Sequence, residues 1–279
     1  MLSIEAVNKY YISDGKLLEI ENTAEFKSIR GPLVYEVNRV MDGVVLFEEG
    51  HVKRLKDSLE MLGHEMQYSE EQVDQMMAQL IEANEVENQN IKIVYGNLED
   101  REHKMLLYFV KSHYPDRSVY SKGVKTILFE SERENPNAKV VDQSLRDRIN
   151  EKIAEEGAFE ALLVDENGYI TEGSRSNFFY IVDGKLYTPP AEKVLLGITR
   201  REVIAAAQER GIELEEKPLR AADIESVDGA FVTGTSIDAL PIAQVGDIML
   251  DTANNEIMKS IIEGYNKRVE DYVAKKKTD

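Results

Sequence analysis

The chain has 279 residues, of which 42% are hydrophobic and 31% charged, and its formal net charge is −18. This length and composition are typical of a folded globular protein with two modest domains, and they do not suit a disordered chain. The acidity argues against a nucleic-acid-binding protein, which needs a basic surface, and the absence of cysteine excludes disulfides and thiolate chemistry.

The N-terminal segment MLSIEAVNKYYISDG lacks the basic stretch and apolar core of a secretory signal. No apolar run elsewhere is long enough to span a bilayer. We therefore expect a cytoplasmic protein that has no membrane partner.

The first part of the chain alternates predicted strands and helices. LVYEVNRV and VVLFEE flank Asp42-Gly43, a dipeptide typical of a tight hairpin turn. Apolar residues at 52, 55, 59 and 62, followed by Gly63, predict a helix, and the capping-box spacing of Ser69 and Gln72 predicts a second. The strands IKIVYGN and KMLLYFVKS complete an α+β unit.

A polar, turn-rich segment, SHYPDRSVYSKG, is the predicted linker, so we expect domains at residues 1–115 and 116–279. The second domain contains the predicted strand GVKTILFE and a helix that stops at Gly157. Further strands are predicted at FEALLVD, GYITEG, NFFYIVD, KLYTPP and AFVTGTS, with a helix from about residue 200 to Arg210 and a final amphipathic helix. The predicted fold class is α/β (α+β) with two domains.

Two short segments have the composition of an anion-binding site. In LLGITRREV, Thr199 and Glu202 have capping-box spacing, so we expect Thr199 to open a helix after a tight turn at Gly197. Free N–H groups at such a helix start can bind phosphate. Thr233-Gly234-Thr235-Ser236 places hydroxyl groups at a strand end. Taken alone, either segment can equally be a plain helix start or turn.

Two residues are candidates for covalent and proton-transfer chemistry. Lys139 lies in NPNAKVVDQ among mostly small or apolar neighbours, where a lysine loses its proton more easily and can form an imine. Glu172 lies near the end of GYITEG, and a carboxylate there could hold the proton of a pyridinium ring. The residues alone leave open that both side chains simply face solvent.

Together these segments resemble the class IV aminotransferases, the family with fold type IV that includes branched-chain aminotransferases, D-amino-acid aminotransferases and 4-amino-4-deoxychorismate lyases. The spacing from Lys139 to Glu172, 172 − 139 = 33 residues, is similar to that of the family. The matching segments, in family order, are VYEVNRV, HVKRLKDSLEMLG, PNAKV, GYITEGSRSNFF, LYTPPAEKVLLGITRREVI and FVTGTSIDALPI.

The resemblance implies a homodimer with pyridoxal 5′-phosphate at the domain junction. It implies Lys139, which carries the cofactor as a Schiff base, and Glu172, which faces the pyridine nitrogen, as catalytic residues. The other implied cofactor-binding residues are Arg54, Asn177, Gly197, Ile198, Thr199 and Thr235. Arg54 could otherwise be an exposed arginine on a helix. Tyr35 and Ser236 are implied on the substrate side, and no metal is expected.

The implied reaction moves an amino group between an amino acid, of branched-chain or D-amino-acid type, and a 2-oxo acid. One alternative is a 4-amino-4-deoxychorismate lyase that releases pyruvate. Another is a non-catalytic pyridoxal-phosphate-binding homologue, against which the retention of both Lys139 and Glu172 argues.

The sequence departs from the family pattern in two places. KVVDQS lacks the tyrosine that branched-chain enzymes carry after the lysine. Arg101-Glu102-His103 has the letters of the Arg-x-His carboxylate trap of D-amino-acid enzymes, so Arg101 and His103 are candidate substrate-binding residues. Because the pair abuts the strand KMLLYFV, the favoured interpretation is a polar hairpin tip.

Overall fold

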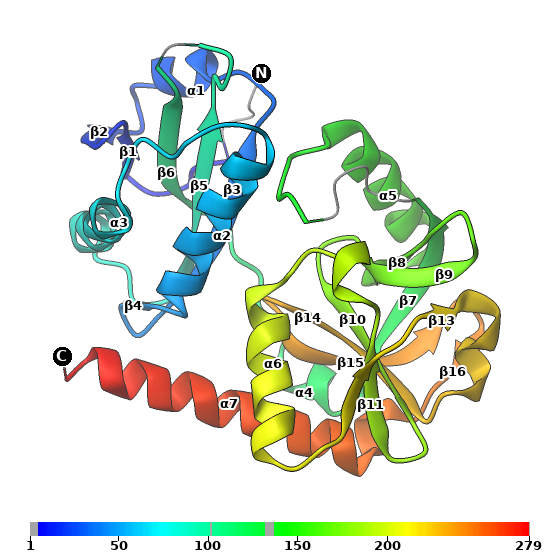
Figure 1. Ribbon diagram of the computed structural model, residues 1–279. Coiled ribbons are helices and arrows are strands. Elements are labelled where there is room, and N and C mark those ends of the chain that lie inside the picture. The colour runs from blue at the N-terminus through cyan, green and yellow to red at the C-terminus, as the bar shows by residue number, and fades with distance from the viewer. Residues whose placement is uncertain (1–4, 101, 132–136, 279) are drawn as a thin grey trace. The chain divides into compact units, whose positions relative to one another are not determined.

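The computed structural model describes residues 5–100, 102–131 and 137–278 (Figure 1). These residues form two compact units that both mix helices and strands, which confirms the predicted fold class. The first unit consists of Met1–His113, Ala138–Val141 and Asp271–Asp279, and the second of Tyr114–Asn137 and Asp142–Glu270.

An antiparallel sheet forms the centre of the first unit, with the strand order β2-β1-β6-β5-β3-β4. Its strands are β1 (Tyr10–Ser13), β2 (Lys16–Glu19), β3 (Val34–Met41), β4 (Val44–Val45), β5 (Gln89–Gly96) and β6 (Lys104–Val110). The hairpin between β3 and β4 is confirmed, because Asp42 and Gly43 have positive φ angles of 51° and 78°. The predicted strand VVLFEE is wrong beyond Val45, since a helix begins at Glu48.

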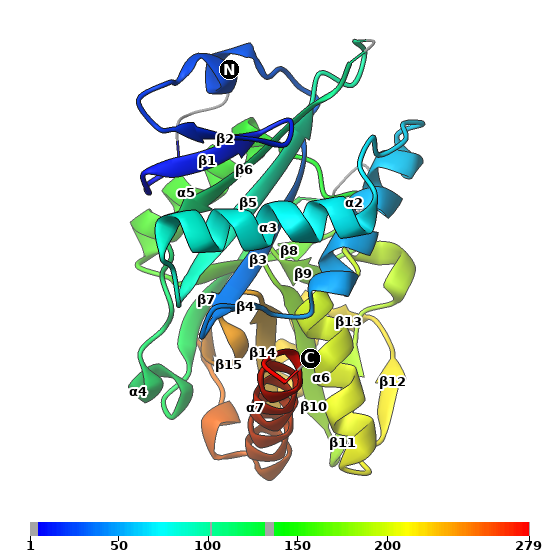
Figure 2. The same ribbon diagram turned by 90° about the vertical axis from the view of Figure 1, so that its left-hand side faces the viewer.

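Two helices, α2 (Glu48–Met61) and α3 (Glu70–Asn84), cover one face of this sheet, and Figure 2 shows α3 crossing in front of β5 and β6. The capping box that opens α3 is confirmed. Ser69 Oγ accepts a hydrogen bond from Gln72 N at 3.2 Å, and Gln72 Oε1 accepts one from Ser69 N at 2.8 Å. Apolar side chains of both helices, including Leu55, Leu59 and Met77, form a fully buried core with the sheet.

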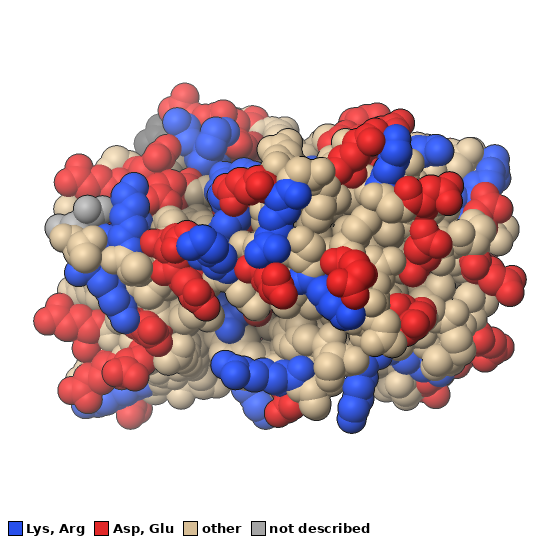
Figure 3. Space-filling view, turned by 90° about the horizontal axis from the view of Figure 1, so that it is seen from below, with Lys and Arg blue, Asp and Glu red and all other residues tan. Residues whose placement is uncertain are grey.

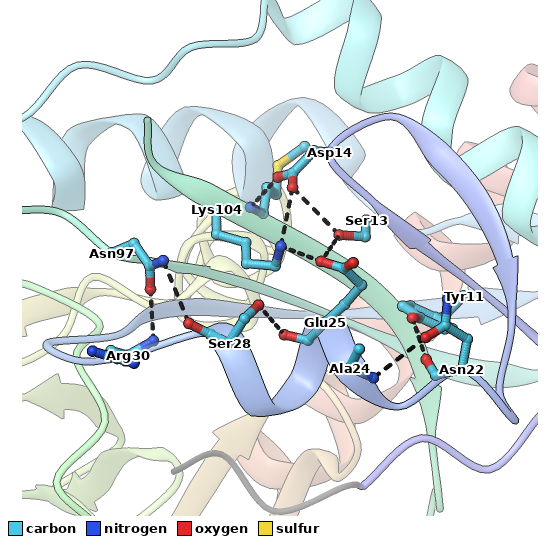
Figure 4. Close-up of polar contacts among 11 residues, drawn as sticks. Tyr11, Ser13, Asp14, Asn22, Ala24, Glu25, Ser28, Arg30, Asn97 and Lys104 are labelled. Atoms are coloured by element: carbon cyan, nitrogen blue, oxygen red, sulfur yellow. Dashed lines mark hydrogen bonds and ion pairs between the residues drawn. The ribbon is translucent and has the colours of Figure 1, made fainter. Parts of the chain in front are cut away.

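A short helix, α1 (Ala24–Ser28), covers part of the opposite face. Its Phe26 ring packs between Tyr11 and Tyr108, with ring centroids 4.8 and 5.1 Å away. Lys104 on β6 binds the carboxylates of Asp14 and Glu25 (Figure 4). These contacts attach the helix and the β1–β2 hairpin to the middle of the sheet.

Residues 138–141 return to the first unit and lie along the edge of β3. Val140 forms a bridge with Val34, Tyr35 N donates to Lys139 O at 3.1 Å, and Val141 N donates to Leu33 O at 3.0 Å. The backbone of Lys139 is therefore an added edge segment of the first sheet.

Six strands of the second unit close into a barrel, in the order β10-β14-β15-β7-β8-β9 and back to β10. They are β7 (Val124–Glu130), β8 (Glu160–Val164), β9 (Tyr169–Gly173), β10 (Asn177–Val182), β14 (Gly229–Gly234) and β15 (Asp238–Val245). The closing pair is Glu172 on β9 opposite Asn177 on β10. Shorter strands extend this sheet: β11 (Lys185–Thr188), β12 (Leu214–Glu216), β13 (Leu219–Arg220) and β16 (Ile248–Met249).

Helices lie outside the barrel, and Figure 1 shows α5 (Gln143–Glu156) beside β7 and β8, and α6 (Ile198–Glu209) beside β14. Phe178, Val232 and Leu240 are among the buried residues of the core within the barrel. The predicted linker contains a short helix, α4 (Arg117–Tyr120), because Asp116 caps it by accepting from Ser118 N. Short 3₁₀ turns occur at Ala191–Lys193, Ala221–Ser226 and Thr252–Asn254.

Exposed charges of opposite sign lie close to each other on the surface. Lys152 pairs with Glu155 and Glu156 along α5, and Figure 3 shows basic side chains lying among acidic ones on one face. None of the helices within the described ranges combines the length and the apolar composition that crossing a bilayer demands.

The C-terminal turns of α7 (Glu256–Lys276) belong to the first unit and contact the start of α2. Tyr272 Oη donates to Glu49 Oε2 at 2.8 Å, and Lys276 Nζ lies 3.4 Å from Glu48 Oε2. Burial and the nearby Asp74 carboxylate raise the pKa of Glu48 to about 7, although Lys276 opposes the shift.

This shift makes the stability of the protein depend on pH. A carboxyl group whose pKa is raised in the folded state stabilises the fold when protonated, and that contribution is lost as pH rises from about 4.5 to about 7. Glu48→Gln removes the titration, so its stability relative to the wild type should rise across this interval. Urea unfolding at pH 5 and pH 8 measures it.

The exposed Glu60 on α2 supplies the matched control, Glu60→Gln. Its stability relative to the wild type should be nearly the same at both pH values. An identical pH dependence of Glu48→Gln and the wild type would contradict the assignment.

Candidate active site

The predicted site residues belong to both units. Tyr35, Arg54, His103 and Lys139 lie in the first, and Arg101 lies outside the described residues. The second unit contains Glu172, Asn177, Gly197, Ile198, Thr199, Thr235 and Ser236.

Lys139 is held through its backbone, while its side chain lies over an aromatic ring. Its N–H donates to Ser58 Oγ at 3.3 Å, and its carbonyl accepts from Tyr35 N. Its Nζ lies 4.7 Å from the centroid of the buried Tyr35 ring. Sequence reasoning missed Ser58, although its position four residues after Arg54 puts both on one face of α2.

Arg54 is buried, so its alternative interpretation as an exposed helix arginine is wrong. Its Nε and Nη2 donate to Oε1 and Oε2 of Glu36, both at 2.7 Å. Glu36 is fully buried, and its Oε2 lies 2.9 Å from His51 Nδ1. Sequence reasoning missed Glu36 and His51, because an acidic residue within a strand and a lone histidine carry no distinctive pattern.

The electrostatics of this cluster favour an ionised Glu36 and a neutral His51. Burial raises the pKa of Glu36, but the charge and hydrogen bonds of Arg54, aided by His51, bring it down to about 2. Burial lowers the pKa of His51, and the hydrogen bond from its ring to Glu36 opposes that effect. Since a carboxylate only accepts hydrogen bonds, His51 Nδ1 carries the donated hydrogen.

In the second unit, Glu172 is held where the barrel closes. The residue is 2% exposed, and its Oε2 accepts from Asn177 Nδ2 at 3.3 Å and from Leu195 N at 3.1 Å. Asn177 Nδ2 also donates to Leu195 O at 2.7 Å. The cross-strand register and the loop around Leu195 together fix the carboxylate of Glu172.

The same loop binds the chain just before Lys139. Asn137 Nδ2 donates to Val194 O at 2.8 Å and to Ala191 O at 3.3 Å. A single residue, Ala138, separates Asn137 from Lys139. The loop that positions Glu172 therefore also binds Asn137, within the second unit, and sequence reasoning missed this role of Asn137.

The start of α6 differs from the predicted capping box. Gly197 is the N-cap, the helix begins at Ile198, and no side chain caps it. Thr199 is thus already helical, and Glu202 instead accepts from Arg268 Nη2 at 2.6 Å and Nε at 3.1 Å. Because the Glu202 carboxylate is bound to Arg268, it does not bind the N-cap backbone N–H as a capping box requires.

A close approach at Gly197 leaves no room for a side chain. A Cβ added there would lie 2.0 Å from Asn177 Oδ1, so only glycine lets the start of α6 come this close to Asn177. The first N–H groups of α6, which lack a capping side chain, therefore begin directly beside the residue that binds Glu172.

A buried hydroxyl lies on the same side of the sheet. Thr233 is the cross-strand partner of Asn177, and its Oγ1 is buried without a hydrogen-bond partner among the described residues. Sequence reasoning chose Thr235 and Ser236, which are half-buried in the turn after β14. An unpartnered hydroxyl and a helix start with positive partial charge form a donor set that suits a phosphate group.

His103 lies just before β6. Its ring packs edge-on against Tyr95 and His64, with centroids 5.7 and 5.4 Å away. Its Nδ1 is buried and has no hydrogen-bond partner in the described part of the chain. A role in binding substrate stays a prediction for this residue.

Comparisons with known proteins match most of the chain. The profile of the family described as amino-transferase class IV matches residues 33–245. A branched-chain-amino-acid aminotransferase of Pseudomonas aeruginosa is 29% identical over 231 residues, covering 76% of this chain and 75% of its own. A D-alanine aminotransferase of Bacillus licheniformis is 26% identical over 226 residues, covering 77% and 79%.

The fold also matches solved structures. The crystal structure of a T.th. branched-chain amino acid aminotransferase with pyridoxamine 5′-phosphate superposes with a TM-score of 0.84, at 21% sequence identity and with 95% of each chain covered. This likeness confirms the predicted fold type.

The contact between Gly197 and Asn177 predicts the effect of one methyl group. Gly197→Ala should displace the amide of Asn177 and weaken its hydrogen bonds to Glu172 and Leu195, although the backbone angles of Gly197, φ −62° and ψ 141°, suit alanine. The free energy of unfolding should fall by about 1–3 kcal/mol, measured by urea unfolding.

Gly31→Ala is the matched control, because a Cβ at Gly31 would make only ordinary contacts, the nearest at 3.6 Å. If both variants lose the same small amount of unfolding free energy, the side chain of Asn177 moves aside at little cost, which contradicts the prediction.

Proposed function

The chain belongs to the class IV aminotransferase family, and we propose that it transfers the amino group of an amino acid to a 2-oxo acid with pyridoxal 5′-phosphate held through Lys139. The observation that carries the proposal is the buried Glu172 beside the uncapped start of α6. An anionic group fixed next to an anion-binding helix start suits a ligand that has both a cationic ring and a phosphate.

The chemistry of several residues suits the three polar parts of this cofactor. The N–H groups of Ile198 and Thr199, with the Thr233 hydroxyl, suit its phosphate, and Thr235 is a further donor in the same segment. The Glu172 carboxylate suits a protonated pyridine nitrogen. Lys139 supplies the amine that its aldehyde needs.

Each residue then has a distinct task in the reaction. When bound, pyridoxal phosphate supplies an electron sink for the electron pair left at the substrate Cα. Lys139 Nζ would attach the cofactor, be displaced from it by the substrate amine, and then, as a free amine, take the proton from Cα. Glu172 keeps a proton on the pyridine nitrogen, and Asn177 and Leu195 N keep its carboxylate in place. Arg54 binds the phosphate as a fixed cation.

The substrate side is formed in part by Tyr35, whose ring lies next to Lys139 Nζ. The relatives are named for branched-chain amino acids and D-alanine, which supports an aliphatic or small amino acid as the donor. Ser236 is the proposed contact for the substrate carboxylate, and Arg101 and His103 remain candidates for the same task.

The proposed tasks predict that two variants differ in whether they keep the cofactor. Glu172→Gln should retain the cofactor but lower the turnover rate by roughly 10²–10³-fold, because a neutral amide cannot stabilise the ring cation. Lys139→Ala should leave no cofactor on the chain after borohydride reduction, because its attachment point is missing. Absorbance after dialysis, intact mass and the steady-state rate measure these effects.

Glu166→Gln, at an exposed position in the turn before β9, is the control and should match the wild type in all three measurements. Cofactor that is still attached to the chain in Lys139→Ala would overturn the assignment of this lysine.

A second experiment distinguishes a transaminase from a lyase. With an amino-acid donor and no acceptor, the protein should release about one 2-oxo acid per active site and stop, because the amino group stays with the protein. Adding 2-oxoglutarate should restart the release. A panel of D- and L-amino acids identifies the donor. Sustained release of pyruvate from 4-amino-4-deoxychorismate without an acceptor, together with no release of a 2-oxo acid from any amino acid of the panel, would contradict the proposal.

A further inference from the structure

One carboxylate in the first unit binds the arginine that the proposed function assigns to the cofactor phosphate. Glu36 on β3 is fully buried and binds Arg54 through two hydrogen bonds, both at 2.7 Å. His51 binds the same carboxylate at 2.9 Å. The two contacts to Arg54 are parallel and bidentate, so they fix the plane of its guanidinium as well as its position.

The helix that carries Arg54 also holds Lys139. His51, Arg54 and Ser58 lie at helical spacing on one face of α2, and all three are buried. Ser58 Oγ accepts from Lys139 N. The charge of Lys139 contributes, after burial and Arg54, to the lowered pKa of His51, which indicates that the lysine and the Glu36 cluster are close.

A gain in folding stability does not by itself explain why Glu36, Arg54 and His51 are buried together. Burying a carboxylate and a guanidinium removes both from water, and replacing such a pair with apolar side chains often leaves a protein equally stable or more so. A bidentate pair does, however, fix where an arginine points. The remaining N–H groups of Arg54 lie on the other edges of its guanidinium, and planar recognition of phosphate depends on their direction.

We infer that Glu36 is a positioning residue that aims Arg54 at the phosphate of the cofactor, while His51 keeps the Glu36 carboxylate from rotating. This inference rests on the proposed function, because it needs a phosphorylated cofactor attached to Lys139. It goes beyond that function by assigning Glu36 and His51, which act through Arg54, a part in selecting the phosphorylated cofactor.

The inference makes a prediction about two ligands that differ only in the phosphate. Pyridoxal 5′-phosphate and pyridoxal both have the aldehyde that Lys139 attacks, so the Kd of pyridoxal divided by the Kd of pyridoxal 5′-phosphate isolates the effect of the phosphate. Glu36→Gln should reduce this ratio at least about tenfold, mainly by raising the Kd of the phosphorylated ligand. Titrations in phosphate-free buffer, followed by absorbance, measure both constants.

A second variant, Glu36→Asp, distinguishes the effect of the position of Arg54 from the effect of the carboxylate charge. Glu36→Asp keeps the negative charge and the buried ion pair but shortens the side chain by one methylene group. The ratio should fall in this variant too, because Arg54 is drawn out of place. If Glu36→Gln does not fold, which circular dichroism shows, Glu36→Asp decides. Arg54→Ala gives the ratio that remains without the arginine, and the exposed Glu60→Gln is the control.

Three results settle the inference. A reduced ratio in the Glu36 variants, with the Kd of pyridoxal nearly unchanged, supports it. An unchanged ratio in folded variants overturns it, and so does an equal rise of both Kd values, which indicates general loosening of the site. A wild-type protein that does not attach pyridoxal phosphate through Lys139 would instead contradict the proposed function.

Discussion

Strands β9 and β10 meet at one residue pair, Glu172 opposite Asn177, and this pair closes the barrel of the second unit. A carboxylate buried at such a junction needs hydrogen-bond donors, because an unpaired buried charge costs several kcal/mol. Asn177 and the N–H of Leu195 supply them. The loop through Leu195 then leads into Gly197 and α6, so the carboxylate and the uncapped start of α6 belong to one hydrogen-bonded network.

Buried carboxylates position other groups in both units. Glu160 in the second unit is buried and accepts from Ser174 Oγ and Ser176 Oγ, which lie between Glu172 and Asn177. It therefore holds the turn that joins the two closing strands. In the first unit, the buried carboxylate of Glu36 has a similar role, but it binds the guanidinium of Arg54 instead of a turn. In each case the desolvation of the charge is offset by several hydrogen bonds of defined direction.

Sequence reasoning succeeded where a few neighbouring residues determine the structure. The turn at Asp42-Gly43, the capping box of Ser69 and Gln72, and the helix end at Gly157 depend on local backbone geometry, which residue type predicts well. It failed at Thr199 and Glu202, whose capping-box spacing is the same, because Arg268 binds Glu202 from 66 residues away. The roles of Glu36 and Asn137 were missed for a similar reason, since their partners lie in other elements of the fold.

The first unit is discontinuous in sequence, because its sheet edge is completed by residues 138–141 and its helix layer by residues after 270. During synthesis on a ribosome, β3 emerges long before the segment that pairs with Leu33 and Tyr35. Until then the nascent sheet has an open edge next to Tyr35, and open edges are where chains associate wrongly. The lysine segment thus also covers that edge late in synthesis, so the first unit gains its native edge only after residues 114–137, the first stretch of the second unit, have been translated.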